Sequence, residues 1–251
     1  MVKFGSYTLP HVLTIRETYS RIRQEVPLPG RSWAYRKDRG GLGGQITLSG
    51  EIRADVEQTR DEIAALADGV ARILDYESPD LIALEATLRY QAGPIWTDDT
   101  AEAKTPAGTP FTLLGANTDF FYFAHRERFN KLQFDLEILG SYGARTWEYS
   151  NGVGGWNVLS IGTDGTNGFS QDGTVAFSPP SGWHPDTVNE VANKFWVRVS
   201  VASVTTPASV NQILMNKVFN CIMLDPTFPQ AVELYKRLPY SLIFLQQENP
   251  T

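Results

Sequence analysis

Residues 164–177, DGTNGFSQDGTVAF, crowd Asp, Asn, Thr and Gly together as calcium-binding loops do. An EF-hand loop needs oxygen ligands at alternate positions and a bidentate Glu at its twelfth position. A loop beginning at Asp164 would place Thr166 third, Gly168 fifth and Val175 twelfth. Gly168 offers no side-chain ligand and the required Glu is missing, so the spacing does not support calcium binding.

Tight turns explain the same segment better. Its two Asp-Gly pairs, 164–165 and 172–173, are typical of hairpin turns that need residues with positive φ. Phe169, Val175 and Phe177 would then be strand residues that pack inward. Two copies of Asp-Gly-Thr do not make a repeat array. The sequence therefore predicts β-turns at this segment.

The other reactive side chains are scattered. His11, His125 and His184 have no His or Cys partner at metal-ligand spacing. Cys221 is the only cysteine and lies in the apolar run VFNCIML, which predicts a small buried residue. We therefore predict no catalytic residues, no metal ligands and no residues that bind a cofactor, and we expect no cofactor.

An enzyme remains the weakest alternative. A glycan-cleaving enzyme would need a pair of carboxylates projecting from β-strands, and LQFDLEI supplies only Asp135 and Glu137. Both alternate with Leu132, Phe134 and Leu136, so they are expected on the solvent face of a half-buried strand. The glycine-rich RGGLGG at 39–44 lacks the Gly-Lys-Ser/Thr ending of a phosphate loop and precedes a strand, so it predicts a flexible loop.

Composition limits the class of protein. The chain has 251 residues, of which 42% are hydrophobic and 20% charged, as in soluble, well-packed proteins. The net charge of −6 provides no basic field for direct nucleic-acid recognition. No apolar stretch reaches the length of a membrane span, and the N-terminus lacks a signal-peptide pattern. We expect synthesis in a cytoplasm and no membrane insertion.

The first hundred residues predict an α+β unit. Residues 7–18 read as extended, 25–44 as a long Pro-, Gly- and Arg-rich loop, and 45–54 as a strand with alternating apolar residues. Thr59 and Glu62 fit a capping box, and apolar residues at helical spacing follow as far as Leu74. Residues 81–93 suggest a strand pair, and the polar stretch 97–110 suggests a boundary.

The remainder of the chain is richer in strands. Short apolar strands with turn signals every eight to twelve residues predict an antiparallel β-sandwich. The pattern relaxes at 205–211 and ends in the β-rich YSLIFLQ, with a possible short helix in PTFPQAVELYKRL. The predicted fold class is mainly β: an α+β domain over 1–105, an inserted lectin-like sandwich over 106–206, and a segment 207–251 that returns to the first domain.

Large aromatic residues are the remaining candidates for ligand binding. Trp147, Trp156, Trp183, Trp196 and Tyr149 lie in or beside predicted strands of the sandwich. Aromatic faces on a β-sandwich can stack on sugars, but in strands such residues are more often packed between the sheets.

The run from 147 to 201 resembles a module of phage tail and baseplate proteins. Its pattern is Trp147 and Tyr149 in one strand, Trp156-x-x-Leu159, the segment 164–169, the segment 173–177, Pro180-x-x-Trp183, and Trp196-Val-Arg-Val199. The flanks add a strand, a long loop, ITLSGEI, a helix and a final strand, which together resemble the ring-forming domain of distal tail proteins of long-tailed phages.

The resemblance implies a virion structural protein and no enzyme activity. It would be a distal tail or baseplate ring subunit, in a ring that is a hexamer in this family, connecting the tail tube to the host-adsorption apparatus. Its partners would be copies of itself, the tail tube protein, and tail hub, fibre or baseplate proteins, in the virion at the tail tip after assembly in the host cytoplasm. The loop 25–44 is the candidate intersubunit arm, and a disordered surface loop is the alternative.

A second function is a carbohydrate-binding or adhesion module. In that case the sandwich would present an aromatic platform to a host-surface glycan. The two hypotheses differ in self-association, which only the ring requires.

Overall fold

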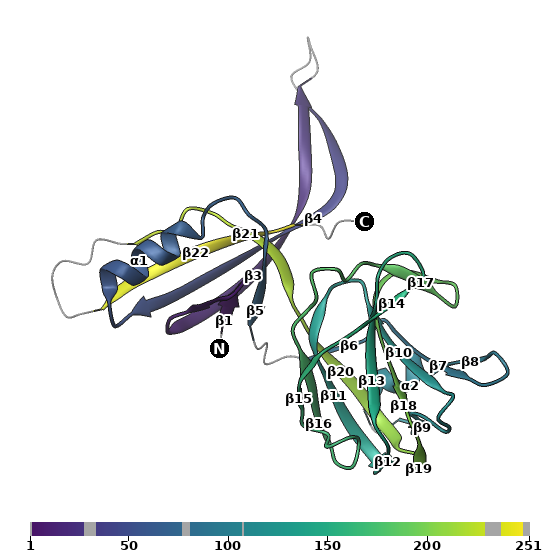
Figure 1. Ribbon diagram of the computed structural model, residues 1–251. Coiled ribbons are helices and arrows are strands. Elements are labelled where there is room, and N and C mark those ends of the chain that lie inside the picture. The colour runs from purple at the N-terminus through teal and green to yellow at the C-terminus, as the bar shows by residue number, and fades with distance from the viewer. Residues whose placement is uncertain (1, 28–33, 77–80, 107, 229–236, 248–251) are drawn as a thin grey trace. The chain divides into compact units, whose positions relative to one another are not determined.

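The computed structural model describes residues 2–27, 34–76, 81–106, 108–228 and 237–247 (Figure 1). The protein is mainly β, with antiparallel strand pairs, which confirms the predicted fold class. The chain divides into two compact units. The terminal unit comprises residues 1–77 and 219–249, and the inserted unit comprises residues 78–218.

One seven-stranded sheet forms the terminal unit, in the order β2-β1-β5-β21-β22-β4-β3. Both ends of the chain contribute, because β22 pairs with β4 from Leu238 opposite Ile52 to Leu245 opposite Gln45. The strands are β1 Val2–Phe4, β2 Tyr7–Leu9, β3 Val12–Pro27, β4 Ala34–Ile52, β5 Arg72–Tyr76, β21 Phe219–Met223 and β22 Leu238–Gln246.

One face of this sheet is the core of the terminal unit. Ile46, Leu48 and Ile52 are buried, as the alternation in 45–54 predicts. Helix α1 (Val56–Ala65) lies against the sheet and buries Ile63 in the same cluster (Figure 1). Cys221 is also buried in this cluster, as predicted.

The predicted helix start and length are wrong. Helix α1 begins at Val56, so Thr59 lies inside it and its hydroxyl donates to the Ala54 carbonyl instead of capping. The helix ends at Ala65 because the chain turns at Asp68 and Gly69. Gly69 has φ +78°, and Asp68 Oδ1 accepts the Val70 N–H. Of the apolar residues that follow, Ile73 and Leu74 belong to β5, whereas Val70 is exposed before that strand begins.

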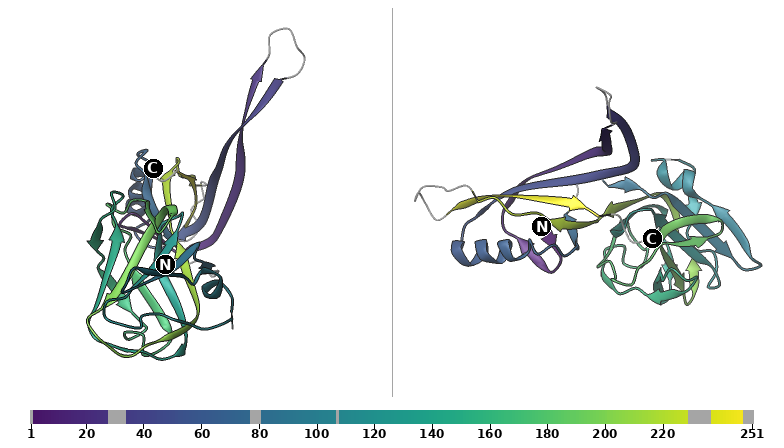
Figure 2. Two further views of the ribbon diagram at one scale, coloured as in Figure 1. Left: turned by 90° about the vertical axis from the view of Figure 1, so that its right-hand side faces the viewer. Right: turned by 90° about the horizontal axis from the view of Figure 1, so that it is seen from above.

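The predicted loop at 25–44 is also wrong for the described residues. Strands β3 and β4 pair continuously as far as Pro27 opposite Ala34, with two register shifts, and the RGGLGG segment lies within β4. Residues 28–33, including Arg31, lie outside the described residues. Figure 2 shows the two strands leaving the sheet as a long ribbon. The prediction failed because the sequence of this ribbon lacks the apolar alternation that signals a strand.

The inserted unit contains two main sheets around one core. The first has the order β14-β13-β18-β10-β7-β8, with β17 beside β18, and the second has the order β15-β16-β11-β20-β6, with β9 beside β20. The strands of the first sheet are β7 Ala86–Gln91, β8 Ile95–Asp98, β10 Phe120–His125, β13 Arg145–Ser150, β14 Trp156–Val158, β17 Asp186–Val188 and β18 Val191–Val201.

The second sheet supplies the other wall of the core. It consists of β6 Ile82–Ala83, β9 Phe111–Thr112, β11 Phe129–Ile138, β15 Ile161–Asp164, β16 Gly173–Phe177 and β20 Ser209–Lys217. Strands β12 (Ser141–Tyr142) and β19 (Val204–Thr206) form a separate small pair. Trp183 is fully buried, and its indole N–H donates to the Trp196 carbonyl at 3.0 Å.

The unit boundaries differ from the predicted ones. Residues 81–105 belong to the inserted unit because β7 pairs with β10, and the polar stretch near 100 contains the short helix α2 (Thr100–Lys104). Strand β20 pairs with β11, so 207–218 also belongs to the inserted unit. Residues 219–249 group with 1–77. The helix suggested in PTFPQAVELYKRL falls largely outside the described residues.

The turn at 164–177 takes a form that the Asp-Gly pairs did not indicate. β15 and β16 form a hairpin, and its connection places positive φ at Asn167, Gly168 and Phe169. Phe169 is nevertheless fully buried. Val175 and Phe177 are also buried, as predicted.

Gly50 is expected to tolerate no side chain. A Cβ at this position would lie 2.5 Å from the Tyr240 hydroxyl oxygen and 2.7 Å from the His11 carbonyl oxygen. Tyr240 cannot move freely because it is buried and its hydroxyl donates to the Pro10 carbonyl. We expect Gly50→Ala to destabilise the terminal unit by about 1–3 kcal/mol in urea unfolding.

The matched control for this substitution is Gly162→Ala. A Cβ at Gly162 would lie 3.5 Å from the Ala176 carbonyl oxygen, an ordinary contact. Equal stability losses in the two variants would contradict the steric explanation.

Candidate functional site

The first sheet of the inserted unit has two apolar faces. Phe121, Phe123, Val197 and Val199 point into the core between the sheets. Because side chains alternate along a strand, the intervening residues point to the opposite, outer face. These residues form a second cluster with neighbours from β7, β8 and β14.

Five rings of this second cluster form what we call the aromatic row: Tyr90, Trp96, Phe120, Tyr122 and Trp156. Cross-strand register positions them, since Tyr90 lies opposite Trp96 on one side and Phe120 on the other. Ring centroids are 5.0 Å apart for Tyr90 and Trp96, 5.2 Å for Trp96 and Tyr122, and 5.5 Å for Tyr122 and Trp156. Tyr122 is buried, and the other four rings are partly exposed.

An ion pair interrupts the aromatic row. The Arg198 guanidinium lies 4.3 Å from the Trp156 ring and 4.5 Å from the Phe120 ring. Its Nε donates to Glu148 at 2.7 Å, and each of the two side chains is 18% exposed. Burial raises the pKa of Tyr122, against a smaller opposite effect of its contact with Arg198. The face therefore combines rings in edge-to-face or tilted contact with oriented hydrogen-bond donors and acceptors.

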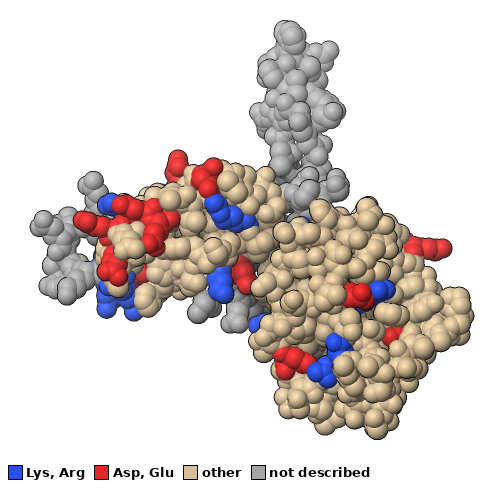
Figure 3. Space-filling model, viewed as in Figure 1, with Lys and Arg blue, Asp and Glu red and all other residues tan. Residues whose placement is uncertain are grey.

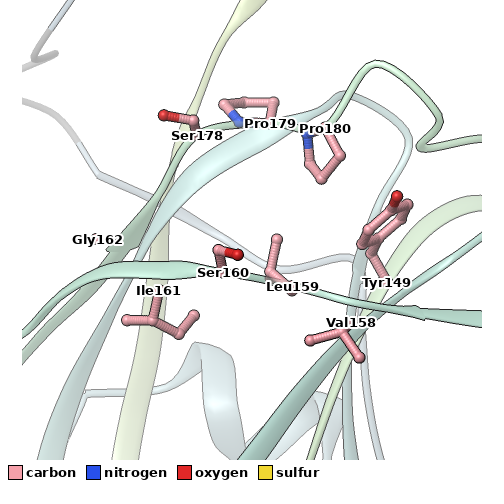
Figure 4. Close-up of a pocket in the computed structure, with 9 residues that line it drawn as sticks. All are labelled: Tyr149, Val158, Leu159, Ser160, Ile161, Gly162, Ser178, Pro179 and Pro180. Carbon is pink, nitrogen blue, oxygen red and sulfur yellow. The ribbon is translucent and has the colours of Figure 1, made fainter.

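A separate open cleft lies where β13 and β14 approach the segment 178–180. Its volume is about 440 Å³. Figure 4 shows Tyr149, Leu159 and Ser160 on one side and Pro179 and Pro180 on the other. The lining side chains are apolar or hydroxyl-bearing, so the cleft suits a small neutral ligand. The residues are Tyr149, Val158, Leu159, Ser160, Ile161, Gly162, Ser178, Pro179 and Pro180.

The aromatic candidates from the sequence separate into two groups. Trp147, Trp183 and Trp196 are buried, whereas Trp156 and Tyr149 are partly exposed. Trp156 belongs to the aromatic row and Tyr149 to the cleft.

Sequence reasoning missed the other four rings of the aromatic row. The signal was present in FFYF (120–123), whose alternate residues face opposite sides, and in the hairpin around Gly93 and Pro94. The hairpin places Tyr90 opposite Trp96, but neither pattern says which other strands lie alongside.

The calcium-like segment uses its acidic side chains to hold the turn. Asp164 accepts hydrogen bonds from the Thr166 N–H at 3.0 Å and the Gly168 N–H at 3.2 Å. Asp172 accepts the Leu136 N–H at 2.7 Å. Among the described residues, no group of three or more His, Cys, Asp or Glu side chains could hold a metal ion.

The remaining candidates are dispersed. Asp135 and Glu137 are exposed on β11, as the alternation predicts. His11 lies in the terminal unit, and His125 and His184 in the inserted unit, where His184 is exposed. His125 is buried beside Glu85, which Lys194 and Arg126 also contact.

Surface charge is uneven over the visible face. Figure 3 shows acidic residues gathered over the region of α1, whose sequence includes Glu57, Asp61 and Glu62. The visible face of the inserted unit carries only scattered charges. In the described part of the chain, no helix is both long and apolar enough to span a bilayer.

The chain matches no protein-family model, and none of the curated proteins matches it significantly. Function must therefore be argued from the geometry above and from the resemblance in sequence pattern.

His125 makes the inserted unit sensitive to acid. Burial lowers the pKa of His125 from 6.5 to about 4, although Glu85 opposes the shift. The folded state thus binds fewer protons than the unfolded state between these values, so stability is lost as pH falls from about 6.5 to 4. The lowered pKa of Glu85 acts in the same direction. We expect a loss of up to about 3 kcal/mol from His125, measured by urea unfolding against pH.

The substitution His125→Asn separates this contribution. The His125 Nδ1 accepts the Glu127 N–H at 3.0 Å, and an Asn side-chain oxygen can accept the same hydrogen bond without titrating. His184→Asn, at an exposed position, is the control. The explanation fails if His125→Asn keeps the wild-type dependence of stability on pH.

Proposed function

We propose that this protein is a virion structural protein, a ring subunit of a phage tail tip or baseplate that connects the tail tube to the adsorption apparatus. The observation that carries the proposal is the open sheet of the terminal unit, with two unlike outermost strands, β2 and β3. A ring closes only through head-to-tail contacts between two different surfaces of the same subunit. Two unlike sheet edges meet that requirement.

The β3 edge has features of a contact surface. Outermost strands carry unpaired backbone groups that favour pairing with another chain unless they are protected. Near the start of β3, Leu13 is 60% exposed and Ile15 is 37% exposed. Exposed apolar residues on a sheet edge favour a protein partner.

The outer part of the β3–β4 hairpin supports assembly by a second route. Residues 45–50 of β4 pair with both β22 and β3, whereas within 34–44 the register of β4 is with β3 alone. A lone two-stranded ribbon is marginally stable in water, so a neighbouring subunit that packs against it would stabilise it. This ribbon contains the described part of the segment 25–44 that the sequence suggested as an intersubunit arm.

The two units would have different roles in this proposal. The terminal unit would form the ring, a hexamer by the resemblance, and contact the tail tube protein on one side and hub, fibre or baseplate proteins on the other. The inserted unit would contact these proteins or the host surface. Such a protein needs no catalytic residues, and its place would be the virion tail tip.

A hairpin truncation tests the arm. Tyr19 lies opposite Gly44, so replacing 20–43 with Asn-Gly closes a shorter hairpin in the same register. We expect wild-type protein to give closed rings in native mass spectrometry and negative-stain images, and the truncated protein to remain folded but monomeric.

A matched substitution tests the edge separately. Leu13→Lys should weaken the ring without lowering the unfolding temperature, because Leu13 is exposed. Val153→Lys, at an 86% exposed position in the inserted unit, is the control. A monomeric wild-type protein, or rings that survive the truncation, would contradict the proposal in its present form.

A further inference from the structure

We propose that the aromatic row, with Arg198 and Glu148, binds a neutral oligosaccharide. This inference goes beyond the ring subunit and does not require assembly, since all the residues lie in the inserted unit.

The rings provide the apolar half of the site. Tyr90, Trp96, Phe120 and Trp156 are partly exposed on one sheet face, where they leave apolar surface in water. The rings are inclined to one another, and a sugar can bury a C–H face against the exposed part of an individual ring. Trp96 and Trp156 come from the outermost strands β8 and β14 but converge on Tyr122, from which their ring centroids lie 5.2 Å and 5.5 Å away. The two tryptophan rings are therefore at most about 11 Å apart, a span that suits a short segment of an oligosaccharide.

The polar groups favour a hydroxyl-rich ligand over a protein. Glu148 and Arg198 lie opposite each other on β13 and β18, within the row. Protein interfaces are depleted of charged residues at their centre, because a partner must satisfy each group after water is excluded. The pair is oriented by its own hydrogen bond and leaves further guanidinium N–H groups and a carboxylate oxygen for hydroxyl groups.

The charge balance specifies a neutral ligand. The charges of Arg198 and Glu148 compensate each other, and Asp98 is exposed at the β8 end of the same face. Asp98 lies opposite Leu88, which belongs to the outer-face cluster. An acidic or phosphorylated ligand would meet a net negative face, whereas neutral hydroxyls can donate to both carboxylates.

The test is a titration of the full-length protein with three hexasaccharides, built from glucose, galactose or N-acetylglucosamine, by calorimetry and tryptophan fluorescence. We expect at least one to bind with a Kd of about 1 mM or tighter. Trp96→Ala should weaken that binding about tenfold, because it removes a stacking ring. Trp96→Phe, which keeps a ring, should restore affinity to within a few-fold of the wild type.

Two controls define the site. Trp96 also packs on Tyr90 and Tyr122, so thermal unfolding must show that each variant is folded. The Ser160→Phe substitution fills the separate cleft and should leave affinity unchanged. The proposal is overturned if none of the three hexasaccharides binds at about 10 mM. It is also overturned if folded Trp96→Ala binds as the wild type does, or if Ser160→Phe alone abolishes binding.

Discussion

The pairing of β22 with β4 is the constraint on which the terminal unit depends. It joins the last described strand of the chain to a strand that ends at Ile52, and the paired residues alternate between core and surface. Leu242 and Phe244 lie opposite Leu48 and Ile46, so the same contact joins β3 and β4 to the rest of the sheet and contributes to the buried core. Folding of this unit therefore requires a contact between distant parts of the chain. Forming that contact costs loop-closure entropy before the pairing and burial of the strands can compensate for it.

In the inserted unit, strand alternation produces two different apolar surfaces from one sheet. On β10, Phe121 and Phe123 fill the sandwich while Phe120 and Tyr122 face outward. The inner set is covered by the second sheet, and the outer set packs against neighbouring rings, aliphatic residues of the same cluster and Arg198. The inner surface forms the hydrophobic core of the unit. The outer surface instead combines partly exposed rings with the ion pair of Arg198 and Glu148.

Sequence patterns predict this fold where burial alternates locally. The strands around Leu48 and Phe134 are read correctly because one face of each is buried over several residues. The helix predicted from the sequence is too long. Leu74 continues the helical spacing of apolar residues, although the turn at Asp68 and Gly69 follows the end of the actual helix. Apolar spacing reports burial, and a strand after a turn can bury the next residues equally well.

Two other features of the fold cannot be predicted from local sequence patterns. Residues 34–44 pair with β3 although their sequence has no apolar period that would indicate a strand. The aromatic row takes its rings from β7, β8, β10 and β14, so only the strand order brings them together. Of the candidate aromatics, the sequence identified Trp156 and Tyr149, but it could not separate them from Trp183, whose strand-like surroundings look the same.

The pairing of β5 with β21 determines where a domain can be inserted into the terminal unit. Phe219 lies opposite Leu74 on neighbouring antiparallel strands, so the chain leaves the terminal unit after β5 and returns at β21 from the same end of the sheet. Paired residues of this kind lie about 5 Å apart. Any compact domain whose own ends lie close together can occupy the interval without disturbing the seven strands. Recombination can therefore exchange one inserted domain for another while the seven-stranded sheet keeps its fold.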